Sequence, residues 1–308
     1  MKQWIVLIFL TITFGQSFGQ RDALYSQYMF NQLIINPAYS GSREVLSMTL
    51  INRYQWVGIE GSPQTFTFSA HSPLQNDNVS LGLVIASDKI GPTTDFNLMA
   101  NYTYRVRLYK GKLCFGLQAG LNQINIDWNK IRPEDQSDIL YTSLPANTLK
   151  PDFNIGTYYY TDHFYIGASA RHLFESDYGI AYYDNGTTTY AKLMRHYFFT
   201  AGAAIELNKN LVLKPSVLVK YVSDAPVSAD FNASVLLLNA LWLGSSFRTG
   251  QDALVFITEF PITKNMRLGY SYDTYLGKIR PYTKGSHEIM LGFDFDLFKK
   301  RMLTPRYF

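Results

Sequence analysis

Residues 96–108 read FNLMANYTYRVRL, and every second side chain in this stretch is apolar or aromatic. The residues between them carry amide, hydroxyl or guanidinium groups, apart from Met99. Because successive side chains of a β-strand point to opposite faces, the stretch predicts one apolar face and one polar, cationic face. Residues 112–122 repeat the pattern after Lys110-Gly111, which is a two-residue signal for a tight hairpin turn. The sequence thus predicts an antiparallel hairpin whose two faces differ in polarity.

The same alternation recurs along most of the chain and predicts fourteen strands. Most of them reach the ~9–11 residues that a tilted strand needs to cross a bilayer. The predicted strands cover residues 45–57, 64–73, 79–88, 95–109, 112–125, 151–161, 163–173, 195–207, 211–222, 228–238, 241–248, 253–261, 266–275 and 287–298.

The connectors between these strands favour a membrane barrel. Short turns alternate with longer connectors, and two connectors, near residues 126–150 and 174–194, are very long. This layout is typical of an all-β transmembrane antiparallel barrel with short periplasmic turns and longer extracellular loops. The alternative is a secreted soluble β-sandwich or repeat protein, which would have no reason to sort its connectors in this way. We therefore expect a barrel of about fourteen strands in the bacterial outer membrane.

Composition excludes several other classes of protein. Hydrophobic residues make up 47% of the 308 residues and charged residues 17%, which is not the balance of a disordered chain. A formal charge of +4 without a basic run gives no support to a nucleic-acid partner. A single cysteine rules out a disulfide framework and any metal site built from several cysteines.

The two ends of the chain differ from the predicted barrel, which spans residues 44–298. Residues 1–19 combine Lys2, an apolar run from Trp4 to Phe14 and small residues before Gln20, which is the pattern of a secretory signal peptide. Residues 20–43 do not alternate cleanly, and we expect them to form a plug at the periplasmic mouth of the barrel or to lie beneath it. The alternative for this segment is an unstructured leader. Residues 299–308 are expected to form a periplasmic tail.

Blocks of residues spread over the mature chain resemble one known family. The first reads SQYMFNQLIINPAYSGS at residues 26–42, and the last is the tail PRYF at residues 305–308. Together they resemble the PorP/SprF family, outer-membrane proteins of the type IX secretion system in Bacteroidota. One departure is Gln32, where the family has proline. The residues that carry the resemblance are Asn36, Pro37, Ala38, Gly41, Arg53, Trp56, Gly58, Pro63, His71, Asp88, Gly91, Tyr270, Tyr272, Asp273, Gly285, His287 and Glu288.

This resemblance implies a non-enzymatic barrel that supports secretion or surface anchoring of large type IX cargo such as gliding adhesins. The implied partners are the C-terminal domain of a cargo protein or adhesin, periplasmic type IX components linked to peptidoglycan, and outer-membrane lipid. The alternative is an outer-membrane channel for a small solute. A barrel-embedded hydrolase is a weaker third class. The resemblance implies no cofactor and no catalytic residue.

Neither metal-ligand nor catalytic spacing is found among the histidines. His71, His163, His172, His196 and His287 are scattered singly, without a His-Glu-x-x-His pattern. Ser286-His287-Glu288 contains residue types used in catalysis, but neighbouring strand residues point to opposite faces and cannot form a catalytic pair. We therefore expect no metal and no catalytic site. Charges of both signs on the polar faces predict either a paired network in the lumen or a grip on an inserted segment.

The two long connectors are unusually rich in aromatic residues. Tyrosine and tryptophan are favoured anchors at protein interfaces. These side chains predict either a lid folded over the barrel or a contact for the cargo. The candidate partner-binding residues are Trp128, Tyr141, Tyr178, Tyr182, Tyr183 and Tyr190.

Tyr102 and Asn101 test the alternation, because they are neighbours on opposite predicted faces. We expect Tyr102→Arg to cost ~2–4 kcal/mol of membrane folding free energy near the middle of the bilayer, since the arginine would face lipid. Asn101→Arg should cost little, because it would face a polar lumen. Refolding titrations with lipid vesicles measure both, and equal costs would contradict the assignment of faces.

Overall fold

The computed structural model describes residues 22–75, 77–131, 147–184, 187–223 and 225–297. The expected signal peptide, residues 1–19, and the expected tail, residues 299–308, lie outside the described residues. Among the residues described, no helix is long and apolar enough to cross a membrane.

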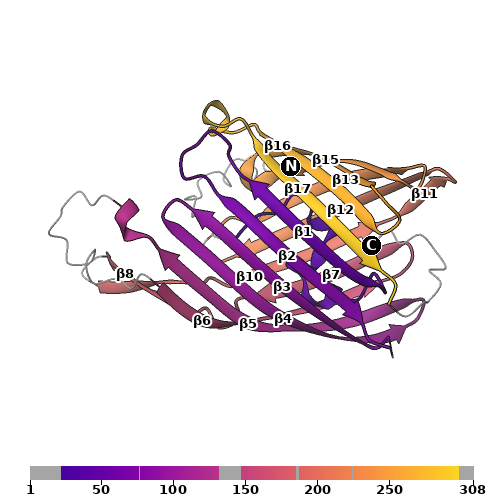
Figure 1. Ribbon diagram of the computed structural model, residues 1–308, viewed down its shortest axis with the longest axis horizontal. Coiled ribbons are helices and arrows are strands. Elements are labelled where there is room, and N and C mark those ends of the chain that lie inside the picture. The colour runs from indigo at the N-terminus through magenta and orange to yellow at the C-terminus, as the bar shows by residue number, and fades with distance from the viewer. Residues whose placement is uncertain (1–21, 76, 132–146, 185–186, 224, 298–308) are drawn as a thin grey trace, which may run out of the picture.

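Fourteen antiparallel strands close into a barrel, as predicted (Figure 1). Each strand pairs with the next in the chain, β1 pairs with β17, and β10 pairs with β12. Closure leaves no free sheet edge along the wall. The barrel strands are β1 (Leu46–Tyr54), β2 (Gln64–Pro73), β3 (Val79–Ile90), β4 (Thr93–Leu108), β5 (Gly111–Ile126), β6 (Asn147–Tyr160), β7 (Phe164–Arg171), β10 (His196–Ala203), β12 (Leu211–Val222), β13 (Ser228–Leu237), β14 (Leu241–Arg248), β15 (Ala253–Pro261), β16 (Met266–Tyr275) and β17 (Ser286–Phe295).

Three further strands depart from the sequence-based prediction. β8 (Asp177–Asp184) and β9 (Thr187–Lys192) form a separate hairpin inside the connector at 174–194, where the sequence predicts no strand. This hairpin projects from one end of the barrel (Figure 1). The strand predicted over 195–207 is interrupted at Ala204, and its second part is β11 (Ile205–Asn208), which pairs only with β12.

The wall shows the expected division between an apolar outer face and a polar inner face. On β4, Leu98, Tyr102 and Tyr104 are exposed, whereas Asn101 and Thr103 are buried. Exposed phenylalanine, leucine and tyrosine side chains recur on the outside of most strands. An apolar outer surface is what lipid requires of a spanning barrel, so the outside of this sheet is the membrane face.

The two ends of the barrel carry different connectors. We call the end at which β1 begins and β17 ends the turn end, where the connectors are 74–78, 109–110, 161–163, 204–210, 238–240 and 262–265. We call the opposite end the loop end, where they are 55–63, 91–92, 127–146, 172–195, 223–227, 249–252 and 276–285. The tight turn at 91–92 is a short exception. In outer-membrane barrels the end with short turns faces the periplasm.

Six short 3₁₀ turns complete the described structure. Three of them, η1 (Tyr28–Phe30), η2 (Gln32–Ile34) and η3 (Pro37–Tyr39), precede β1. The others, η4 (Trp128–Lys130), η5 (Thr249–Gln251) and η6 (Arg280–Tyr282), lie in loop-end connectors. The apolar side chains of η1–η3 are buried inside the barrel, where they pack with wall residues in its two main hydrophobic clusters.

The orientation of the barrel can be tested with one introduced cysteine at each end. Tyr109 at the turn end is 96% exposed and Tyr282 at the loop end is 73% exposed, whereas the native Cys114 is fully buried. On intact cells, we expect a membrane-impermeant maleimide to label Tyr282→Cys but not Tyr109→Cys. Both variants should be labelled after lysis. Labelling of Tyr109→Cys alone on intact cells would invert the orientation.

Candidate functional site: the polar interior and the N-terminal segment

The chain before β1 lies inside the barrel. We call residues 22–43 the inner segment; every residue from Tyr25 to Ser42 is buried. Asp22 contacts His172 at the loop end, and Arg43 contacts Asp294 at the turn end. The inner segment therefore extends along the lumen from one end to the other.

A buried cation on β1 is neutralised by two carboxylates, one on the adjacent strand β17 and one on β16. Arg53 Nη2 lies 2.7 Å from Asp273 Oδ2, and Nη1 lies 3.3 Å from Glu288 Oε2. All three side chains are completely buried. Arg53 and Glu288 are direct cross-strand partners, so the sheet register itself brings them together. We call Arg53, Asp273 and Glu288 the carboxylate clamp.

The carboxylate clamp holds the backbone of the inner segment. The two oxygens of Glu288 accept hydrogen bonds from the backbone N–H groups of Ser26 and Gln27, each at 2.8 Å. The hydroxyl of Ser26 donates to Asp273 at 2.8 Å, and Arg53 Nη1 donates to the same hydroxyl oxygen at 2.8 Å. Hydrogen bonds with a charged partner are roughly twice as strong as neutral ones. This contact fixes one point of the inner segment against three strands of the wall.

A second buried ion network continues the clamp around the barrel. Arg248 on β14 donates to the carbonyl of Tyr25 at 3.2 Å and lies 3.6 Å from Asp273. Its Nε lies 3.4 Å from Asp230 on β13, which accepts from Lys220 on β12 at 2.9 Å. The lumen charges thus form a paired network and also grip an inserted segment, so both readings of the mixed charges apply.

The middle of the inner segment lies directly on the wall. The side chain of Asn36 accepts from Ala38 N at 2.9 Å, which caps η3, and donates to the carbonyl of Thr157 at 2.9 Å. Asn101 and Thr103 both donate to the carbonyl of Pro37, at 3.0 and 2.9 Å.

Glycines on three neighbouring strands permit this close approach. A Cβ on Gly116 would overlap the backbone of Pro37 and Ala38, and a Cβ on Gly156 would overlap the side chain of Asn36. Gly167 faces the amide of the same asparagine. A glycine in a strand often marks a place where another backbone approaches closely.

Near the turn end, two further motif residues meet. The backbone N–H of Gly41 donates to Nδ1 of His71 at 3.0 Å. Gly41 has a φ of +74°, a conformation that other residues rarely adopt. Next to this contact, Arg43 and Arg267 both pair with Asp294, at 2.9 and 3.1 Å.

At the loop end, Asp22 closes a second cluster of charges. It accepts from Arg171 at 3.0 Å and lies 3.1 Å from Nε2 of His172. Burial alone raises the pKa of the Asp22 carboxyl, but the charges of His196, His172 and Arg171 outweigh it and hold the pKa well below its usual range. Burial lowers the pKa of His172, but Asp22 and Asp152 outweigh it and raise the pKa to about 9.

The remaining motif residues lie outside this interior contact. Trp56, Gly58 and Pro63 belong to the connector after β1, where the backbone N–H of Trp56 donates to Ser286 Oγ at the start of β17 at 3.0 Å. Val57 in this connector donates to the carbonyl of Gly285, so the connectors at 55–63 and 276–285 are joined. Asp88 and Gly91 lie at the loop end of β3. Tyr270, Tyr272 and His287 form an aromatic group on the outer face, with Tyr270 Oη 2.7 Å from His287 Nδ1.

Of the candidate partner-binding residues, only Trp128 has a described side chain. It packs against the buried cluster of Ile124, Ile126 and Leu193, which joins the end of β5 to the residue after β9. The backbones of Tyr178, Tyr182, Tyr183 and Tyr190 belong to the β8–β9 hairpin. Their side chains and the whole of Tyr141 lie outside the described residues.

Ser286, His287 and Glu288 do not form a catalytic group. The hydroxyl of Ser286 lies 2.6 Å from the hydroxyl of Tyr275, and Glu288 faces the inner segment. His287 contacts the outer tyrosines instead. A serine nucleophile needs a base within hydrogen-bonding reach. This arrangement supplies none to Ser286.

Sequence reasoning missed the partners of the inner segment and one histidine cluster. In the sequence His172 and His196 stand singly, but strand pairing makes His196 the cross-strand partner of Arg171, the residue before His172. The two histidine rings are therefore only 5.7 Å apart. The expectation that Asn101→Arg costs little also needs revision. Asn101 is 3% exposed and bonded to Pro37, so an arginine there would displace the inner segment.

Gly116 tests whether the inner segment must touch the wall. We expect Gly116→Ala to destabilise the folded barrel by ~1–3 kcal/mol, because the added methyl group has only backbone to displace. Gly277 in a loop-end connector is the matched control, since a Cβ there would meet Asp252 at an ordinary 3.4 Å. Urea unfolding in detergent micelles measures both variants. Equal stabilities would show that the contact is not needed.

Solved structures similar to this chain include a hydrocarbon channel and an outer-membrane protein. The monoaromatic hydrocarbon channel CymD has a TM-score of 0.51 at 12% identity, and the match covers 91% of this chain and 95% of that chain. Omp33 from Acinetobacter baumannii has a TM-score of 0.46 at 8% identity, covering 82% of this chain and 99% of that chain. At such identities the likeness to CymD shows the barrel fold alone. No curated protein matches the sequence.

A family model described as "Type IX secretion system membrane protein PorP/SprF" matches residues 17–293. The match covers nearly the whole chain, including the inner segment, the carboxylate clamp, thirteen barrel strands and most of β17. The chain therefore belongs to the PorP/SprF family of type IX secretion system membrane proteins.

Proposed function

We propose that this outer-membrane barrel is a non-enzymatic anchor that supports the secretion or surface retention of large type IX cargo, such as gliding adhesins. The observation that carries the proposal is the inner segment, which is buried along the lumen and held by the carboxylate clamp. A barrel filled by its own chain acts through its two ends and not through its interior.

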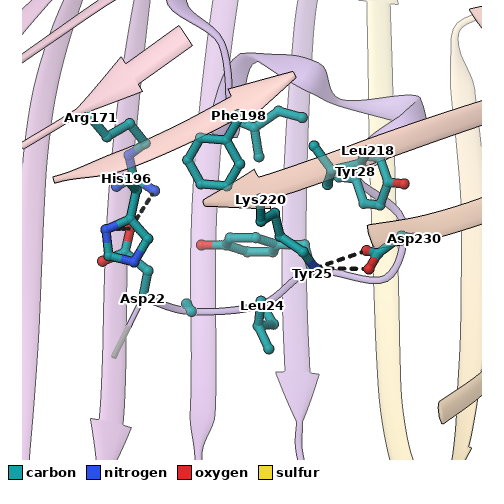
Figure 2. A pocket seen from close by; sticks show the side chains of 12 residues that line it. Asp22, Leu24, Tyr25, Tyr28, Arg171, His196, Phe198, Leu218, Lys220 and Asp230 are labelled. Carbon is teal, nitrogen blue, oxygen red and sulfur yellow. Dashed lines mark hydrogen bonds and ion pairs between the residues drawn. The ribbon is translucent and has the colours of Figure 1, made fainter. Parts of the chain in front are cut away.

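The filled lumen also argues against the alternative of a channel for a small solute. A cavity beside the inner segment, lined by residues such as Tyr25, Phe198 and Leu218, has only about 20 Å³ of space for water (Figure 2). One water molecule needs roughly 10–15 Å³ by this measure. A solute would have to displace buried ion pairs and backbone hydrogen bonds to pass.

The loop end carries features that suit a protein contact. The β8–β9 hairpin projects beyond the wall, and its base is anchored by the cluster of Trp128 and Leu193 (Figure 1). Phe174, in the connector that contains this hairpin, is 64% exposed, and Tyr282, in the loop-end connector between β16 and β17, is 73% exposed. Exposed aromatic side chains are frequent anchors of protein interfaces. We assign the C-terminal domain of the cargo or adhesin to this end.

The other parts of the proposal concern export and the periplasm. Residues 1–19 would direct export as a signal peptide and be removed. Residues 20–43 would then act as a plug, and residues 299–308 as a periplasmic tail. The turn end would contact periplasmic type IX components linked to peptidoglycan, and Tyr109 and Leu238 are its strongly exposed apolar side chains. The aromatic outer face would contact lipid.

Substitutions in the β8–β9 hairpin can distinguish a loss of cargo retention from a loss of barrel folding. In a strain that lacks the native protein, we replace Tyr178, Tyr182, Tyr183 and Tyr190 with serine. Surface biotinylation with mass spectrometry then measures which type IX cargo remains on cells. We expect at least one large cargo to fall by roughly 10-fold, because interface tyrosines carry much of the binding energy.

Tyr109→Ser at the turn end is the control for loss of an exposed tyrosine. Both variants should insert and keep heat-resistant migration on gels. Unchanged surface amounts of every type IX cargo in the four-tyrosine variant would show that the hairpin is not the contact. Steady conductance of the wild-type barrel in planar bilayers would favour the channel alternative instead.

A further inference from the structure

Two histidines and an aspartate converge at the loop end of the lumen, away from the carboxylate clamp. Asp22 belongs to the inner segment, His172 follows β7, and His196 begins β10. One potential ligand atom of each lies within 4.8 Å of one from each of the others. Figure 2 shows Asp22, Arg171 and His196 together at one end of the cavity, with Lys220 and Asp230 at the other.

His172 is oriented as a metal-bound histidine is. Its Nδ1 lies 2.8 Å from Oδ2 of the buried Asp152, and its Nε2 lies 3.1 Å from Oδ1 of Asp22. Histidines that bind metals almost always donate their second ring N–H to a carboxylate, a backbone carbonyl or water. Asp152 occupies that position here and leaves Nε2 facing Asp22.

His196 shows the second common form of this arrangement. Its Nδ1 lies 2.9 Å from the carbonyl oxygen of Met194, which fixes the ring, and 4.0 Å from Oδ2 of Asp22. The side chain is only 8% exposed, and its Nε2 is buried without a hydrogen-bond partner among the described residues. A buried polar atom without a partner costs roughly 1–3 kcal/mol in general, so it points to a ligand.

Asp22 supplies an anionic oxygen that is itself held in place. Its Oδ2 accepts from Arg171 at 3.0 Å, while Oδ1 faces His172. Carboxylates that bind metals are in turn hydrogen-bonded by neighbouring groups. Asp22 and Asp152 together place two negative charges around His172 and so favour a cation at its ring.

We infer that Asp22, His172 and His196 form a binding site for a divalent transition metal of the Zn²⁺ class. Two imidazoles and one carboxylate suit Zn²⁺ and its neighbours, whereas Ca²⁺ and Mg²⁺ prefer oxygen ligands only. Bonds of about 2.0–2.2 Å would require the three side chains to close in, and the metal would take the place of the proton between His172 Nε2 and Asp22, which is released to solvent. The adjoining cavity of about 20 Å³ has room for a water molecule as fourth ligand.

The site would attach the start of the inner segment to two wall strands. Asp22 is the ligand from the inner segment, His172 begins the connection between β7 and β10, and His196 is the first residue of β10 after it. This connection also contains the β8–β9 hairpin, so the metal would join the lumen filling to the base of the projecting hairpin. This inference does not depend on the identity of the cargo.

The test uses the full barrel, purified in detergent without a histidine tag and stripped of metal. Co²⁺ is the probe, because cobalt bound by nitrogen and oxygen ligands absorbs visible light. We expect one Co²⁺ per barrel, displaced by Zn²⁺. His172→Ala and His196→Ala should each weaken the binding at least ~10-fold, while His163→Ala in an exposed turn should leave it unchanged.

The metal affinity of Asp152→Asn provides a second test, because it would not change if the cluster only supported the fold. Asp152 orients His172 without binding the metal, and such positioning residues typically change metal affinity by ~10–100-fold. Asn keeps the size of the side chain, so the barrel should still fold and keep its heat-resistant migration.

Two results would overturn the inference. One is the absence of stoichiometric Co²⁺ binding by the wild-type barrel. The other is equal affinity in the wild type, the two histidine variants and Asp152→Asn. Either result would show that the cluster is an ion-pair network that holds Asp22 without a metal.

Discussion

Arg53 is a cation with no access to water, and the interior of this barrel depends on how its charge is balanced. Asp273 and Glu288 lie within 3.3 Å of its guanidinium, and all three groups are completely buried. Removing one partner of a buried ion pair typically costs about 3–5 kcal/mol, because an uncompensated charge remains. Here two carboxylates face one guanidinium, and the excess negative charge is met by Arg248 and by the backbone N–H groups of Ser26 and Gln27. The inner segment is therefore part of the charge balance of the wall.

The same logic explains how a segment without regular strands can lie inside a barrel. Buried backbone groups must be paired, and three short 3₁₀ turns satisfy only some of them. Side chains of the wall supply the missing partners, as Ser169 does for the carbonyl of Ile35 and Asn101 does for that of Pro37. Glycines such as Gly116 give the segment room to approach these donors. Wall and segment are therefore complementary in both hydrogen bonding and shape.

The wall could be predicted from sequence because its signal is local. A period of two residues on β4 separates Tyr102 from Asn101 without reference to any other part of the chain. The contents of the lumen have no such signal. Ser26 meets Glu288 across 262 residues, and His172 meets His196 only because β7 and β10 pair across an intervening hairpin. Family resemblance picked out Arg53, Asp273 and Glu288 individually, but only the closed barrel shows that they form one group.

A filled barrel also restricts where partners can act. The clamp and the ion pairs at both ends hold the inner segment along the lumen, so moving it out would expose Arg53, Asp273 and Glu288 together. Such a change is costly unless a new occupant supplies two backbone N–H groups and a hydroxyl in the places of Ser26 and Gln27. A folded cargo domain cannot do this inside a lumen that is already packed. Binding at the projecting hairpin and at the exposed turns requires no such rearrangement, which is why we propose the two ends as the contact surfaces of this barrel.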